Sequence, residues 1–151
     1  MKVVHSLLVQ DDQILLLFKP SRQKWFLPGG KAEFGENVIQ TGCREFFEET
    51  GLELKNAELA AVTTVVVEED EGSREWMLYT VKGTDSSGHL IIENREGSLA
   101  WHTIKDIDAL PMFEGDRFII KELLKSNVPV VSTQFYTPSY ELIKIVSGKG
   151  E

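Results

Sequence analysis

The sequence predicts an α/β fold in which a mixed β-sheet is sandwiched between helices. Three features support it: short apolar runs rich in β-branched residues, two longer segments with the 3.6-residue period of amphipathic helices, and turn-forming residues between them. Strands and helices in this arrangement favour an α/β/α sandwich. With 151 residues, 42% hydrophobic and 26% charged, the chain is expected to form one domain over residues 1–151.

The strands of the N-terminal half are predicted from apolar runs. Residues 3–9 and 14–19 are two such runs, and the polar segment 10–13 between them predicts a hairpin. Residues 57–67 are rich in β-branched side chains and predict a long strand. An acidic turn then leads to a further strand at residues 76–81.

The C-terminal half predicts shorter strands. Residues 85–88 have the composition of a loop, and residues 99–103 that of a short strand. Residues 130–136 and 140–146 are two strands that can pair across the turn between them. The last few residues of the chain are expected to be disordered.

Two segments predict amphipathic helices. In the first, residues 37–50, the apolar side opposite the acidic side is formed by Ile39, Cys43, Phe46 and Phe47. In the second, residues 116–125, the side chains expected to face inward are Phe118, Ile119, Leu123 and Leu124. Gly42 within the first helix suits close packing, and Gly51 suits the left-handed position that ends a helix.

The first helix carries a cluster of carboxylates. Glu45, Glu48 and Glu49 are three and four residues apart, so they lie within one turn on one face of a helix. Their like charges repel, and a hard divalent cation such as Mg²⁺ or Mn²⁺ would relieve the repulsion. Arg44 stands four residues before Glu48 and can pair with it. Glu36 precedes the helix, where a carboxylate suits the positive end of the helix dipole.

The segment from Gly30 to Leu52 resembles the Nudix box, G-x5-E-x7-R-E-U-x-E-E-x-G-U, where U is a bulky apolar residue. Every specified position is matched. The resemblance implies a Nudix hydrolase with an α/β/α sandwich that cleaves phosphoanhydride bonds of nucleotides with Mg²⁺, or alternatively Mn²⁺. The metal ligands that it implies are a backbone carbonyl of Gly29 or Gly30, together with Glu36, Glu45, Glu48 and Glu49. Arg44 and Glu49 are the implied catalytic residues of the box.

Two later segments resemble MutT-like enzymes that act on oxidised purine nucleotides. Glu96, five residues before Trp101, stands where these enzymes carry a glutamate that reaches the metals. The resemblance implies that Glu96 is an extra metal ligand or the general base, and Glu49 is the other candidate for the base. The segment from Leu110 to Arg117 resembles their base-binding motif. It implies that Phe113 stacks on the nucleobase and that Asp116 hydrogen-bonds to it.

The chain departs from this subgroup at two positions. Some purine-sanitising enzymes carry two adjacent acids in the base-reading segment, and the first of the two is Gly115 here. They also carry a polar residue after the tryptophan of the glycine turn, where this chain has Phe26. These departures affect base specificity and not hydrolysis.

Charge and composition exclude several classes of partner. The net charge of −8 argues against binding to nucleic-acid polymers or to anionic membranes. The chain has neither a signal segment nor an apolar run of 18 residues, so a cytoplasmic protein is expected. Cys43 is the only cysteine, which excludes an internal disulfide and favours a place in the core. Both a monomer and a homodimer are compatible with the sequence.

Three functions are consistent with these features. The first is Mg²⁺-dependent hydrolysis of a nucleoside triphosphate, with 8-oxo-dGTP as the candidate substrate, to the monophosphate and diphosphate. The second is hydrolysis of another nucleotide, such as ADP-ribose or a dinucleoside polyphosphate. The third is a non-catalytic nucleotide-binding module of the same fold. The complete set of glutamates argues against the third, and Phe113 and Asp116 favour the first over the second.

Overall fold

The computed structural model describes residues 1–148 of the chain; the residues expected to be disordered, 149–151, lie outside this range. The helices are α1 (Val38–Thr50), the 3-10 helix η1 (Ile104–Ala109) and α2 (Glu114–Lys125). The strands are β1 (Lys2–Gln10), β2 (Gln13–Lys19), β3 (Lys24–Phe26), β4 (Gly29–Lys31), β5 (Leu52–Lys55), β6 (Glu58–Val67), β7 (Arg74–Gly83), β8 (Asp85–Gly88), β9 (Glu93–Asn94), β10 (Gly97–Thr103), β11 (Val130–Tyr136) and β12 (Leu142–Ser147).

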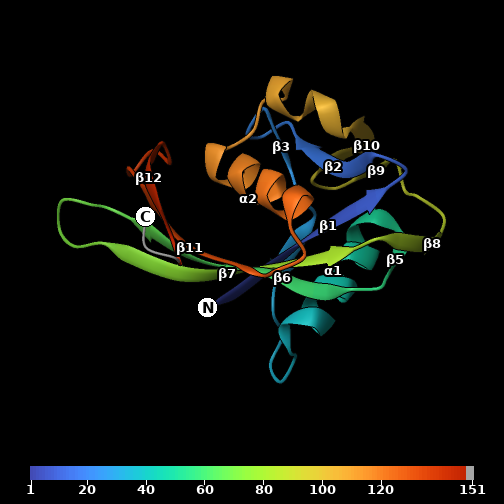
Figure 1. Cartoon of the computed structure of the whole chain (residues 1–151), viewed down its shortest axis with the longest axis horizontal. Coiled ribbons are helices and arrows are strands. Elements are labelled where there is room, and N and C mark those ends of the chain that lie inside the picture. Colours follow the sequence, from blue (N-terminus) through green and yellow to red (C-terminus); the bar gives the residue numbers. More distant parts are fainter. Residues whose placement is uncertain (149–151) are drawn as a thin grey trace.

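A mixed sheet forms the centre of the molecule, which confirms the expected α/β fold. Its strand order is β12-β11-β6-β7-β1-β2-β10-β9, with β3 paired to β2 and β4 paired to β1. The β1–β7 and β6–β11 pairs are parallel, whereas β6 and β7 are antiparallel neighbours. The helices α1 and α2 lie on opposite sides of this sheet (Figure 1).

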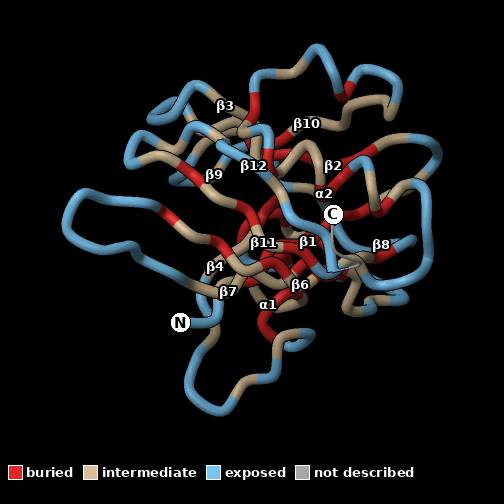
Figure 2. The backbone as a smooth tube through the Cα atoms, turned by 60° about the vertical axis from the view of Figure 1, so that its left-hand side comes forward, coloured by how far each residue is buried: buried red, intermediate tan, exposed pale blue. Residues whose placement is uncertain are grey.

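Two buried apolar clusters lie on the two faces of the sheet, and strand β1 contributes to both because its side chains alternate between the faces. Val4 and Leu8 pack in a cluster with Phe46 of α1, and Leu7 packs in another with Ile119 of α2. All five side chains are fully buried. The buried segments gather in the middle of the fold while the loops around them are exposed (Figure 2). No helix within residues 1–148 has the length and apolar character needed to cross a membrane.

Helix α1 is held at both ends and along its length. Asn37 accepts a hydrogen bond from the backbone N–H of Gln40, whose side chain accepts one in return from the N–H of Asn37. Gly42 permits the expected close packing, because a Cβ there would lie 2.8 Å from Val81 Cγ2 and 3.0 Å from Ser6 Oγ. The carboxylates of the helix are therefore carried on an element that lies directly against the sheet.

Gly51 ends α1 in the left-handed conformation expected from the sequence, with a φ of 79°. We expect Gly51→Ala to destabilise the protein by more than the roughly 1–2 kcal/mol that this backbone conformation costs a residue with a Cβ. The reason is that the Cβ would also meet the carbonyl of His89 and the side chain of Ile91. Urea unfolding measures the difference in free energy.

Gly35 provides a matched control for this prediction. Its φ is also positive, at 84°, but no atom lies within 4 Å of the position of its Cβ. Gly35→Ala should therefore show the conformational cost alone. An equal or smaller loss of stability for Gly51→Ala would contradict the steric contribution.

Three sequence-based boundaries require correction. Residues 85–88 form strand β8, not a loop, because they pair with β5 to make a separate two-stranded sheet. Strand β12 begins at Leu142, since Tyr140 has a φ of 64° and lies in the turn. Helix α2 begins at Glu114 and not at Asp116, so Asp116 lies in its first turn.

The apolar side predicted for α1 is only partly buried. Phe46 is fully buried and Cys43 packs against the same cluster, as expected. Phe47, in contrast, is 56% exposed and Ile39 is 37% exposed. The helix presents Gly42, Phe46 and Glu49 to the sheet, so a carboxylate takes a buried position that the pattern assigned to an apolar side chain.

Candidate active site

Arg44 connects three carboxylates around α1. Its Nε–H and Nη2–H donate to the two oxygens of Glu36 at 2.6 and 2.9 Å. Nη1–H donates to Glu45 at 3.0 Å and, as the sequence predicted, to Glu48 at 3.2 Å. Nη2–H also donates to the carbonyl of Lys31. The guanidinium thus ties the segment before the helix to its acidic face with charge-assisted hydrogen bonds.

Glu36 is fully engaged by protein donors. Besides Arg44, its Oε1 accepts from Thr41 Oγ1 at 2.8 Å and from the backbone N–H of Glu33 at 3.0 Å. The hydrogen bonds from Arg44 are the main cause that lowers the pKa of Glu36 to about 2. Glu36, which the sequence predicted as a metal ligand, therefore holds the Arg44 guanidinium in this structure.

Glu49 is a buried carboxylate beside the glycine turn. The backbone N–H of Gly29 donates to its Oε1 at 3.3 Å. Burial, followed by the negative charges of Glu96 and Glu45, raises the pKa of Glu49 to about 8. The Glu45 carboxylate in turn lies against Gly30, where a Cβ would fall 2.6 Å from each of its oxygens. Glu45 and Glu49 thus both lie against the glycine turn, and the charge of Glu96 acts on Glu49 from nearby.

Glu96 reaches this cluster from the turn between β9 and β10. Asn94 holds the turn, since its Oδ1 accepts from the N–H groups of Glu96 and Gly97, and its Nδ2 donates to the carbonyl of Glu49 at 2.9 Å. Asn94 was missed by the sequence analysis, although an asparagine shortly before a glycine is a common turn signal. Lys19 forms an ion pair with Glu96 at 3.3 Å.

The donor set fits a hard divalent cation. Glu45, Glu49 and Glu96 supply oxygen ligands of the kind that Mg²⁺ and Mn²⁺ prefer, and their mutual repulsion is what a cation would relieve. As placed, however, no three carboxylate, imidazole or thiol groups within residues 1–148 converge closely enough to enclose a metal. Glu36 and Glu48 point instead to Arg44.

A cavity of about 1030 Å³ adjoins Glu96. Phe113 and Asp116, the two residues predicted to contact the base, both line it. The ring of Phe113 lies 5.7 Å from that of Phe26 and 6.3 Å from that of Tyr140. Aromatic side chains that also line the cavity, and that the sequence analysis did not assign to the site, are Trp76, Tyr136 and Tyr140. These aromatic walls suit a planar ligand.

Asp116 is an acidic side chain among the aromatic residues that line the cavity. Burial raises its pKa to about 6, with a smaller opposing effect from Lys19. Its carboxyl group accepts no hydrogen bond and forms no ion pair within the described part of the chain. A half-buried acid without a protein partner favours a ligand that brings its own hydrogen-bond donor.

Similarity to known proteins agrees with this geometry. The family model of the NUDIX domain matches residues 2–123. The chain belongs to the Nudix family. Over 143 residues, 94% of this chain and 90% of the relative, it is 39% identical to the uncharacterized Nudix hydrolase YvcI of Bacillus subtilis.

Two solved structures support the assignment as a Nudix hydrolase. The mutator MutT protein of Bacillus halodurans superposes with a TM-score of 0.94 at 38% identity, over 99% of each chain. A MutT Nudix hydrolase of Burkholderia pseudomallei superposes with a TM-score of 0.65 at 27% identity, over 80% of this chain and 95% of that one.

Proposed function

We propose that this Nudix hydrolase cleaves nucleoside triphosphates to the monophosphate and diphosphate, and that 8-oxo-dGTP is its substrate. The observation that carries the proposal is the single cavity that Glu96 shares with Phe113 and Asp116. A nucleotide in it would have its base between aromatic rings and its phosphates toward the carboxylate cluster. One bound molecule thus accounts for both groups of residues.

The carboxylates around the glycine turn would hold the metal. We assign Glu45, Glu48, Glu49 and a backbone carbonyl of Gly29 or Gly30 to Mg²⁺ or Mn²⁺, with Glu36 in support through Arg44. When bound, such a cation neutralises phosphate charge and lowers the pKa of water. Arg44 acts as a positioning residue because its hydrogen bonds set the directions of Glu45 and Glu48.

Two carboxylates are candidates to take the proton from the attacking water. Glu49 is buried and receives a hydrogen bond from Gly29, which limits its movement. Glu96 is half-exposed and is held by the turn that Asn94 organises. Either would accept a proton while water attacks phosphorus and the bond to the leaving phosphate oxygen breaks.

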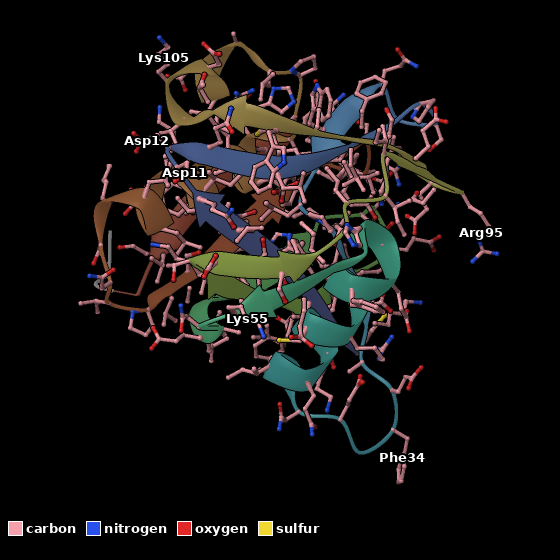
Figure 3. The ribbon with its side chains drawn as sticks, turned by 90° about the vertical axis from the view of Figure 1, so that its right-hand side faces the viewer. Asp11, Asp12, Phe34, Lys55, Arg95 and Lys105 are labelled. Atoms are coloured by element: carbon pink, nitrogen blue, oxygen red, sulfur yellow. The ribbon has the colours of Figure 1, made fainter. Side chains whose placement is uncertain are left out.

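Three basic side chains around the cavity are available to contact an anionic ligand. Lys19, Arg22 and Arg95 all line it, although the whole chain carries a net charge of −8. Arg95 extends outward from the β9–β10 turn (Figure 3). Glu93, Glu96 and Asp116 line the cavity as well, so its charge is mixed, and the basic side chains are the groups that would contact the phosphates.

A panel of nucleotides with Mg²⁺ tests this function. We expect turnover of nucleoside triphosphates with release of diphosphate, and the highest kcat/KM for 8-oxo-dGTP. A higher kcat/KM for ADP-ribose or a dinucleoside polyphosphate would contradict the proposal. Binding of nucleotides without any turnover would indicate a non-catalytic module.

The role of Phe113 is tested by Phe113→Ala. We expect this change to raise KM for purine nucleotides about 5- to 150-fold, which corresponds to the roughly 1–3 kcal/mol of one stacked base. The value of kcat should fall less, since stacking is shared by ground and transition states. Steady-state kinetics on 8-oxo-dGTP and dGTP measure both constants.

Phe47→Ala is the control for this prediction. Phe47 is an exposed aromatic side chain on α1 that does not line the cavity. It should leave KM unchanged. An unchanged KM in Phe113→Ala as well would place the base elsewhere.

A further inference from the structure

Gly115 lies against two polar side chains in the cavity. A Cβ at this position would overlap Tyr136 Oη and Gln134 Oε1. Position 115 is where some purine-sanitising relatives carry an acid, but any side chain here would have to displace these groups. Gln134 is 1% exposed and Tyr136 is 6% exposed, and both line the cavity. The space that a second acid at position 115 would need is therefore occupied by the amide of Gln134 and the phenol of Tyr136.

The direction of the hydrogen bonds in this group follows from the Gly115 carbonyl. A carbonyl oxygen can only accept, so the neighbouring Gln134 amide must turn its nitrogen toward it, as the 3.0 Å contact of Nε2 shows. The amide oxygen of Gln134 then faces Tyr136 and accepts its O–H at 2.5 Å. The proton of Tyr136 is thus used within the protein, and its oxygen retains only lone pairs.

We propose that the Gly115–Gln134–Tyr136 chain makes Tyr136 an obligate hydrogen-bond acceptor, which selects guanine over adenine in the cavity. This inference rests on the proposed nucleotide function and adds residues that determine base specificity. Neither Gln134 nor Tyr136 touches the carboxylate cluster in any hydrogen bond of the described residues. They are specificity residues and not catalytic ones.

The pattern of donors on the bases supports guanine. Asp116 and Tyr136 line the same cavity, and after burial the charge of Asp116 contributes to raising the pKa of Tyr136, so two acceptors lie near one another. Guanine offers adjacent donors to such a pair, the ring N1–H and the exocyclic amine. Adenine has a lone pair at N1 and only one donor group on this edge, its exocyclic amine, so one of the two protein acceptors would face an acceptor in a partly buried site. Oxidation at C8 adds an N7–H donor and removes none.

Two substitutions test the two side chains of this hydrogen-bonded series. Tyr136→Phe removes the acceptor and leaves the ring, whereas Gln134→Met keeps the side-chain length and frees the Tyr136 proton to turn toward the ligand. We expect each to reduce the preference for dGTP over dATP, measured as the ratio of kcat/KM values, by about tenfold or more. In Gln134→Met the change should include a gain in kcat/KM for dATP.

Thr133→Val is the matched control on the same strand. Burial alternates along β11, so Thr133 faces the opposite side of the sheet from Gln134. Thr133→Val should keep the wild-type ratio of dGTP to dATP. Thermal unfolding of all three variants shows whether a change in the dGTP-to-dATP ratio accompanies loss of the fold. Tyr136→Phe removes only one oxygen atom, so we expect it to stay folded.

A binding measurement separates this inference from the proposed function. Calorimetric titration with GMP and AMP in EDTA requires no hydrolysis, and the wild-type protein should prefer GMP. Equal binding of GMP and AMP, no binding of either, or an unchanged ratio in both variants overturns the inference. Preference for GMP without hydrolysis of any triphosphate would support the inference while contradicting the proposed function.

Discussion

Replacing Glu49 with glutamine is expected to lower kcat by about 10² to 10⁴ while the protein stays folded. Glu49 is the buried member of the carboxylate cluster, held by Gly29 and surrounded by the charges of Glu96 and Glu45. Glutamine preserves its shape but removes the negative charge and the capacity to accept a proton. Single-turnover kinetics on 8-oxo-dGTP with Mg²⁺ measure the chemical step.

Variants of other glutamates sharpen this result. Glu48→Gln is expected to fall in the same range, since Glu48 is assigned to the same ligand set. Glu58→Gln, an exposed glutamate at the start of β6, removes one charge away from the site and should retain full activity. A fully active, metal-bound double mutant of Glu48 and Glu49 would disprove the assignment.

Removal of divalent cations is expected to abolish turnover, and Mg²⁺ or Mn²⁺ should restore it. Burial, followed by the negative charges of Glu96 and Glu45, raises the pKa of Glu49 to about 8, so negative charge is already crowded at this point. A polyphosphate that approaches them without a counter-charge is repelled in the same way. Phosphate release in EDTA and after addition of each metal measures the dependence.

Ligand binding to the folded state gives a second readout that needs no substrate. A cation that binds the cluster should raise the Tm of the wild-type protein. The rise should be smaller in Glu45→Gln and Glu49→Gln. Circular dichroism in EDTA serves as the control for unfolding, and full turnover in chelator with the fold intact would refute the metal-dependent mechanism.

The carboxylate cluster was predictable because most of it is local. Glu45, Glu48 and Glu49 belong to one helix, so their spacing alone places them within one turn. Arg44 is four residues from Glu48, and this pairing too is a property of the helix. The tertiary structure added the different surroundings of these glutamates. Glu49 is buried against the glycine turn, while Glu48 is exposed and bound to Arg44.

The cavity was only partly predictable. Phe113 and Asp116 were identified through resemblance to a motif, but Trp76, Tyr136 and Tyr140 belong to β7, β11 and the turn before β12. Aromatic side chains are common in β-strands of any sheet, so their presence in the sequence does not indicate a ligand-binding site.

The sequence by itself determined the family, the mixed α/β fold and the acidic helix face, because these depend on short-range spacing and on hydrophobic periodicity. The tertiary structure alone decided that Asn94 ties the Glu96 turn to α1 and that Gly115 makes room for Gln134 and Tyr136. These contacts join segments that are distant in the chain, and they depend on which strands become neighbours in the sheet. A residue's own sequence neighbourhood contains no record of that pairing.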